Sequence, residues 1–201
     1  MRTTRFPLQQ LRPVRATMFA HVFENRSARI RRQAFWRLRV DFRRLEWMNE
    51  EIESSIMSEF LSLPVRDWSS LVGPVFKDRS GRKFQFGWYG LDWEDTRRVE
   101  FEFVRGRGSR LRLKWSGEID MGGYGAARAN RWEAFSFEVP VRLEGLVIPA
   151  EFVPPSSKNR KQATTIAARY FDLGFLGKPV ARQHEWGGRA FVLPIQAGLT
   201  P

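Results

Sequence analysis

Apolar and polar residues alternate one by one along much of this chain, which is the pattern of half-buried β-strands. The clearest early example is the segment WRLRVDFR at 36–43, where every second residue is large and apolar and most residues between them are arginines. Successive side chains of a strand point to opposite faces. We therefore predict a strand whose apolar face packs on a core and whose arginine face meets water or an anionic partner.

A helix is predicted directly after this strand. Asn49 suits a helix N-cap, and Glu50 and Glu51 would lie in the first turn, where acidic side chains complement the helix dipole. Apolar residues then follow at helical spacing, at Ile52, Ile56, Met57, Phe60 and Leu61, before Leu63-Pro64 ends the helix. The alternative is a single helix over 34–56. It would place four arginines at its positive end, so the strand-then-helix interpretation is preferred.

A hairpin is predicted from the segments VEFEFV (99–104) and RLRLKW (110–115), which alternate on either side of a glycine-containing loop. With the loop at 106–108, the cross-strand pairs are Arg105 with Ser109, Phe103 with Leu111, Phe101 with Leu113, Glu102 with Arg112 and Glu100 with Lys114. Opposite charges then face each other on one side and apolar residues on the other. Such ion pairs contribute at most about 1 kcal/mol each, so apolar burial stabilises the hairpin and the charges select its register.

Further alternation predicts strands at 84–88, 135–143 and 189–195, with Pro140 at a sheet edge or a bulge. A second helix is predicted around 163–171, because its apolar residues form one stripe that ends before Gly174. The stripe consists of Ala163, Ile166, Ala167, Tyr170 and Phe171. The predicted fold class is α+β: a mainly antiparallel β-sheet of about six strands, with two helices packed on one face and a basic N-terminal arm.

The composition predicts one folded unit. At 201 residues, of which 42% are apolar, the chain is long enough to bury a substantial core. No apolar run reaches the roughly 18 residues that a membrane-spanning helix needs. Cysteine is absent, which excludes disulfides, thiolate nucleophiles and cysteine zinc sites. We expect a basic arm at 1–33 and a single α+β domain at 34–201.

Positive charge is concentrated near the amino end. The first 40 residues hold ten arginines and one acid, Glu24, and so carry +9 of the net charge of +12. In one interpretation these arginines neutralise the phosphates of a nucleic acid. In a second the arm is an organelle-targeting segment, although Pro7 and Pro13 interrupt an amphipathic helix. In a third the chain is simply rich in arginine, with 28 Arg and 6 Lys, and the arm packs on its own sheet or on another protein.

Candidates for catalysis are few. His21 lies in the basic arm, and His184 lacks the second histidine four residues away that a helical zinc site requires. Asp92, Glu94 and Asp95 precede two arginines and are interpreted as a solvated turn. Glu118 and Asp120 share one face of a strand end, and a structural role is favoured for them too. The glycine loops GRGSR and GGYG lack the lysine or the following helix of a phosphate-binding loop.

The chain is therefore expected to be a non-enzymatic binding protein that contacts nucleic acid through its arginine-rich arm, within a larger assembly. The alternative is a protein–protein interaction module, such as an assembly subunit or a toxin-neutralising immunity protein. Expected partners are an RNA or DNA backbone or an anionic protein surface, together with other protein subunits; no cofactor and no metal is expected. An intracellular location is favoured, with organelle targeting left open. The residues expected to bind nucleic acid are Arg2, Arg5, Arg12, Arg15, Arg26, Arg29, Arg31, Arg32, Arg37, Arg39, Lys158, Arg160 and Lys161.

Overall fold

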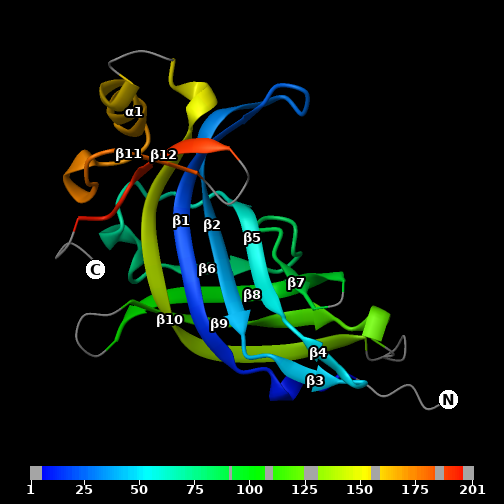
Figure 1. Cartoon of the computed structure of the whole chain (residues 1–201). Coiled ribbons are helices and arrows are strands. Elements are labelled where there is room, and N and C mark those ends of the chain that lie inside the picture. Colours follow the sequence, from blue (N-terminus) through cyan, green and yellow to red (C-terminus); the bar gives the residue numbers. More distant parts are fainter. Residues whose placement is uncertain are drawn as a thin grey trace.

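The chain folds mainly into strands (Figure 1), as seen in a computed structural model that describes residues 6–90, 92–106, 111–124, 131–154, 159–183 and 188–196. The strands are β1 (Pro13–Asn25), β2 (Ile30–Phe42), β3 (Leu45–Trp47), β4 (Glu50–Ile52), β5 (Ser55–Leu61), β6 (Val75–Asp78), β7 (Gly87–Tyr89), β8 (Trp93–Arg105), β9 (Leu111–Asp120), β10 (Trp132–Pro149), β11 (Val180–Gln183) and β12 (Arg189–Leu193). The α-helix is α1 (Asn159–Ala167), and short 3₁₀ helices include η1 (Leu8–Gln10), η2 (Ser69–Leu71), η4 (Gly122–Tyr124), η6 (Ala150–Phe152) and η7 (Leu173–Phe175).

Seven of these strands close into a barrel, in the order β1, β2, β5, β7, β8, β9, β10 and back to β1. Neighbouring barrel strands are antiparallel except at the closure, where β1 runs parallel to β10. The 18-residue β10 makes this possible, since its first half pairs with β9 and its second half lies between β1 and β12. Closure pairs the strand edges that an open sheet would expose.

The α+β prediction is wrong. Strands make up 58% of the structure, and the described residues contain one α-helix instead of two. The predicted basic N-terminal arm is not an appendage either, because residues 13–33 form β1, a turn and the start of β2. The inner positions of β1 are buried in the barrel, but Phe19 and Phe23 place apolar residues on its outer face as well. Apolar residues on both faces hide the alternation that would have identified this strand.

The helix predicted after Asn49 is replaced by a tight hairpin and a strand. Met48 and Asn49 have φ angles of 53° and 66°, so they form the two-residue turn with left-handed backbone that joins β3 to β4. The acidic residues after the turn do not cap a helix. Instead Arg44 donates hydrogen bonds to Glu51 and Glu53, which together raise the pKa of Arg44, with the Glu53 bond as the larger cause. The apolar residues at helical spacing lie in β4, which pairs with β3, and in β5, which pairs with β2 and β7, and this pairing outweighs local preference.

The predicted hairpin of β8 and β9 is confirmed, but its predicted register is wrong by two residues. Phe103 lies opposite Leu113 and Phe101 opposite Trp115, while Glu102 lies opposite Lys114. A shift of two residues keeps every side chain on its predicted face. The apolar face therefore still points into the barrel, and Glu102 forms its ion pair with Lys114, at 3.1 Å, instead of with Arg112.

The strand at 36–42, the helix near 163 and the last strand are confirmed as β2, α1 and β12. Ala163, Ile166 and Ala167 are the buried residues of α1, in agreement with the predicted stripe. Pro140 is the last residue of β10 that pairs with β9, one position before the pairing with β1 begins. Among the described residues, no helix has both the length and the apolar character needed to cross a membrane.

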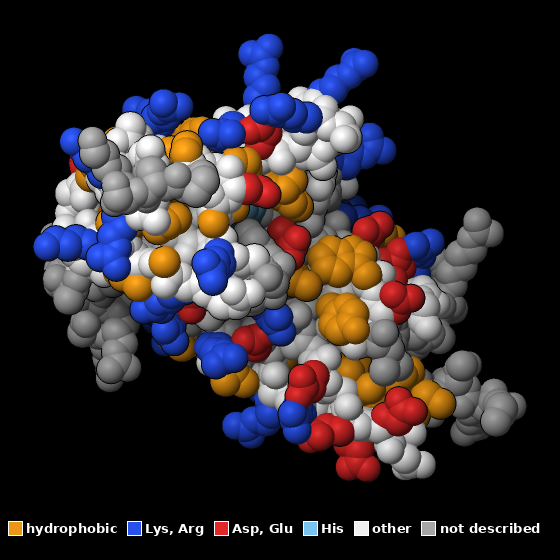
Figure 2. Space-filling model, turned by 45° about the horizontal axis from the view of Figure 1, so that its top comes forward, with side chains coloured by type: hydrophobic (Ala, Val, Ile, Leu, Met, Phe, Trp, Pro, Cys, Tyr) orange, Lys and Arg blue, Asp and Glu red, His pale blue; other side chains and the backbone are white. Residues whose placement is uncertain are grey.

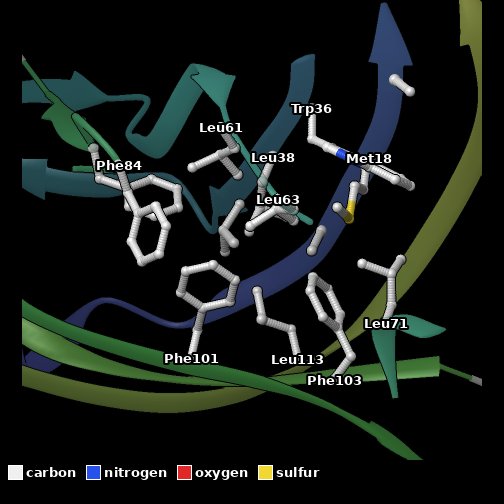
Figure 3. Packing of buried hydrophobic residues seen from close by; sticks show 14 of the residues in the cluster. Met18, Trp36, Leu38, Leu61, Leu63, Leu71, Phe84, Phe101, Phe103 and Leu113 are labelled. Carbon is white, nitrogen blue, oxygen red and sulfur yellow. The ribbon is translucent and has the colours of Figure 1, made fainter. Parts of the chain in front are cut away.

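Large side chains fill the barrel interior (Figure 3). Met18, Leu38 and Leu61 point inward from β1, β2 and β5 and meet Phe101, Phe103 and Leu113 from the opposite wall. These side chains are between 0% and 1% exposed. The barrel therefore acts as a packed core, and any functional site must lie on its outside or at its ends.

Aromatic residues close both ends of the barrel. At the end near β3, in the lower part of Figure 1, Phe6 packs edge-on against Trp47 of β3 and against Trp88, with ring centroids 5.4 and 5.0 Å apart. At the upper end, Trp36 meets Trp68 at 4.6 Å and Phe171 at 5.4 Å. Phe171 follows α1, so its packing fixes the position of this helix over the upper end.

Candidate functional site

The turn between β1 and β2 lies at the top of Figure 1, and its sequence contains Arg26 and Arg29. Asn25 accepts a hydrogen bond from the backbone N–H of Ala28 at 2.9 Å, which is the side-chain turn that asparagine commonly makes. Arg29 follows with φ of 58°, a left-handed conformation that reverses the chain into β2. The backbone of the turn is thus well defined, and it sets where its arginines leave the chain.

The start of β2 contacts the region of α1. The guanidinium of Arg32 lies over the ring of Phe152 in η6, 4.4 Å from its centroid. The hydroxyl of Tyr170, just after α1, donates a hydrogen bond to the carbonyl oxygen of Arg32 at 3.3 Å. These contacts join the β1–β2 turn, η6 and α1 into one continuous surface.

This surface is strongly positive. Its segments, 24–33, 150–154 and 159–170, hold seven cationic side chains and two acidic ones, Glu24 and Glu151. In Figure 2, Lys and Arg side chains spread over the upper part of the molecule, whereas acidic side chains gather mainly at the lower right. We call the seven cations the basic cap: Arg26, Arg29, Arg31, Arg32, Arg160, Lys161 and Arg169.

Glu24 partly neutralises the basic cap. It accepts hydrogen bonds from Arg26 and Arg32, each at 3.0 Å, and these two arginines lower the pKa of Glu24, with the Arg26 hydrogen bond as the largest cause. One carboxylate thus serves two guanidinium groups. Within the described part of the chain, Arg29, Arg31, Arg160 and Lys161 have no acid within ion-pair distance, and all four are solvent-exposed.

Other predicted arginines lie on the outside of the barrel wall, on β1 and β2. Arg15 and Arg39 share Asp41, with Nε–carboxylate distances of 3.0 and 2.6 Å. Arg142 on β10 completes this group, because Thr17 pairs with Arg39 on one side and with Arg142 on the other. We call Arg15, Arg37, Arg39 and Arg142 the outer arginine face.

Arg37 is the most buried member of the outer arginine face, with 7% of its surface exposed. Its guanidinium lies 3.9 Å from a carboxylate oxygen of Glu59 and 5.6 Å from the centroid of the Phe19 ring. Burial lowers the pKa of Arg37, and the neighbouring charge of Glu59 partly restores it. An arginine is protonated throughout the physiological range, so this side chain remains a positive charge beneath the surface.

The predicted site residues therefore form two groups, with some outside both. Arg12 lies beside η1 at the opposite end of the barrel, where it donates a hydrogen bond to the carbonyl oxygen of Gln9 at 2.8 Å. Arg2, Arg5 and Lys158 lie outside the described residues. Arg142 and Arg169 were not predicted from the sequence. Arg169 lies on the exposed side of the helix predicted around 163–171, so it could have been included. Arg142 is recognisable as a site residue only through the pairing of β10 with β1.

A groove of about 970 Å³ crosses the outer side of β5 and β8. Phe60 and Trp93 line it and are 37% and 45% exposed. Its charges offset each other, since the groove holds Glu59 and Asp95 beside Arg82 and Arg97. This groove is a less suitable site for a polyanion than the basic cap.

Two of the carboxylates considered for catalysis, Glu118 and Asp120, are held by arginines. Glu118 accepts hydrogen bonds from Arg97 and Arg98, and although burial alone would raise the pKa of Glu118, these partners lower it. Asp120 binds Arg131 through both oxygens. Glu94, in contrast, has its pKa raised by burial and then by the charges of Asp92 and Asp95. The described residues contain no group of three or more side chains placed to hold a metal ion.

The two histidines also differ in environment. His21 is 1% exposed on the outer side of β1, where the rings of Phe60 and Phe19 lie 5.8 and 6.0 Å away. It is part of an aromatic cluster instead of an exposed arm. His184 lies outside the described residues.

Comparison with known proteins adds no relative. The chain matches no protein-family model, no curated protein and no solved structure.

Proposed function

We propose that this protein binds the phosphate backbone of nucleic acid through the basic cap, as a non-enzymatic member of a larger assembly. The observation that carries the proposal is the excess of seven cations over two acids on one continuous surface at the end of the barrel. Arginine forks suit phosphate oxygens, and interactions of this kind read the backbone and not the base sequence. The packed barrel serves as a rigid support for these side chains.

The test removes three cap charges together, in the variant Arg29→Gln, Arg31→Gln and Arg160→Gln. Affinity falls as salt rises, and each lost phosphate contact makes this fall less steep. The magnitude of the slope of log affinity against log salt decreases by about 0.7 per contact for a single strand and about 0.9 for a duplex. If each side chain meets one phosphate, the slope falls by about 2 to 3, and affinity at low salt falls about tenfold or more. Fluorescence anisotropy with labelled RNA and DNA oligonucleotides, from low to moderate salt, measures both quantities.

The matched control is the variant Arg43→Gln, Arg79→Gln and Arg105→Gln, which removes three exposed arginines outside the basic cap. It has the same net charge as the cap variant, so it separates a local effect from a change in overall charge. Equal reductions in affinity for the two variants, or no binding by the wild-type protein at low salt, would show that the basic cap is not a nucleic-acid site.

A second candidate function is a protein–protein interaction module, favoured by the groove that exposes Phe60 and Trp93 beside charges of both signs. Exposed tryptophan next to arginine is typical of residues that dominate binding energy at protein interfaces. A protein partner should survive nuclease treatment, whereas retained nucleic acid should not. Trp93→Ala is then expected to weaken capture of that partner at least about tenfold, as an interface residue of this kind typically contributes about 2 kcal/mol or more. Tyr89→Ala, an exposed aromatic outside the groove lining, is the control.

A further inference from the structure

The outer arginine face surrounds a shallow depression of about 300 Å³. Four guanidinium groups and two carboxylates line it, so its own acids leave positive charge uncompensated. Thr17 lies between two of the cations, since it pairs with Arg39 across β1 and β2 and with Arg142 across β1 and β10. Adjacent strands are about 4.8 Å apart, so both guanidinium groups can reach one ligand above the threonine.

Most hydrogen-bond donors of this depression are not engaged by its acids. Arg15 and Arg39 each use Nε to bind Asp41, and their terminal amino groups make no hydrogen bond within the described residues. Arg142 lies 3.7 Å from Glu144, which is beyond hydrogen-bond distance, and its side chain is 80% exposed. Each guanidinium has five N–H donors in a planar fork. The depression therefore offers several donors directed at one region of space.

We propose that this depression binds a phosphate group, with the Thr17 hydroxyl and the guanidinium groups of Arg15, Arg39 and Arg142 as its donors. A tetrahedral phosphate has the negative charge to balance the excess cations and enough oxygens to accept from three forks and a hydroxyl. Arg37 also lines the depression, but it is buried and lies 3.9 Å from Glu59, so it is not counted among the donors to the ligand. The site is separate from the basic cap, and its existence does not depend on nucleic-acid binding by the cap.

Inorganic phosphate is the first probe. Binding to the folded state raises the thermal midpoint in proportion to the logarithm of ligand concentration, so the midpoint should rise with phosphate but not with chloride at equal ionic strength. Arg142→Gln and Thr17→Val are both mild, because the first side chain is exposed and the second substitution keeps the shape. Each is expected to raise the apparent Kd for phosphate at least fivefold, and the double variant more than twentyfold.

The control is Arg112→Gln, which removes an arginine paired with Glu138 on the outside of β9. It should leave the phosphate response unchanged. A wild-type protein that responds equally to chloride, or an equally weakened response in the control, would overturn the proposal. Circular dichroism of each variant verifies that the fold is retained.

A second probe identifies the source of the phosphate. If the natural ligand is a strand terminus, a 5′-phosphorylated oligonucleotide should bind at least about tenfold more tightly than its 5′-hydroxyl form, and Arg142→Gln should remove the difference. If the ligand is a small free phosphate, the two oligonucleotides should bind equally while inorganic phosphate still binds. Either result supports a phosphate site. No response to inorganic phosphate together with equal binding of the two oligonucleotides would refute the proposal.

Discussion

Replacing Gly145 by alanine is expected to destabilise the protein by about 3 kcal/mol, because two costs add at one position. Gly145 has a φ angle of +117°, a conformation that other residues rarely adopt. An added Cβ would also lie 2.1 Å from the carbonyl oxygen of Leu193 in β12. The residue sits on β10 opposite Phe19, next to the irregularity in the pairing with β1. Urea unfolding followed by tryptophan fluorescence measures the decrease in the free energy of unfolding.

Gly188→Ala is the matched control for this substitution. A Cβ added at Gly188 would meet no atom within 4 Å, and its backbone is not in the left-handed region. Gly188→Ala is expected to change the free energy of unfolding by less than about 0.5 kcal/mol. A similar destabilisation in both variants would mean that the backbone of β10 is not constrained as described at its parallel pairing with β1, which we call the parallel seam.

The second large effect is expected at Asp78, a carboxylate that organises the segment after β6. Its two oxygens accept hydrogen bonds from the backbone N–H groups of Ser80, Gly81, Lys83 and Phe84, and from the Ser80 hydroxyl. Asp78→Ala leaves these donors without their acceptor in a site that is 5% exposed. Hydrogen bonds to a charged group contribute about 1.5–3 kcal/mol, so we expect the free energy of unfolding to fall by about 3 kcal/mol.

This destabilisation should depend on pH. Burial alone would raise the pKa of Asp78, but the N–H and O–H donors stabilise the carboxylate and lower the pKa below its ordinary value. A group whose pKa is lower in the folded state stabilises the protein above its unfolded pKa, about 3.9 for aspartate. Wild type should therefore lose this contribution as pH falls below about 4, and the difference between wild type and Asp78→Ala should shrink there.

Asp172→Ala provides the comparison for Asp78. Asp172 is exposed and caps η7 through one hydrogen bond, to the N–H of Gly174 at 2.8 Å. Its removal should cost about 1 kcal/mol. An Asp78 variant no less stable than this one, or a difference that persists at pH 3, would contradict the role assigned to the carboxylate.

Local patterns predicted the elements whose two faces differ in polarity. In β2 the apolar residues point inward and the arginines outward, so alternation identified both the strand and its faces. The faces of β8 and β9 were also predicted, although their register was not, because a two-residue shift leaves the pattern unchanged. For the candidate site, the sequence could thus predict that Arg37 and Arg39 lie on the outward face of a strand.

Features that depend on long-range pairing could not be predicted. Helical spacing of apolar residues around Ile56 indicated a helix wrongly, because β5 gains its hydrogen bonds from β2 and β7. The place of Arg142 beside Thr17 required the pairing of two strands that are far apart in the chain. The hydrogen bond from Tyr170 to Arg32, which links the region of α1 to the start of β2, also joins residues far apart in the chain. Such interactions carry no local signal in a single sequence.

The parallel seam has a consequence for biosynthesis. It joins residues 16–21 to residues 141–147, so β1 cannot complete this pairing until the chain up to residue 147 has been synthesised. At a translation rate of about 5–20 residues per second, this delay lasts on the order of ten seconds. During that time the nascent β1–β2 hairpin presents an unsatisfied apolar side, including Met18 and Leu38, to the surrounding medium. High contact order of this kind makes folding slow and prolongs the exposure of apolar surface before β1 and β10 pair.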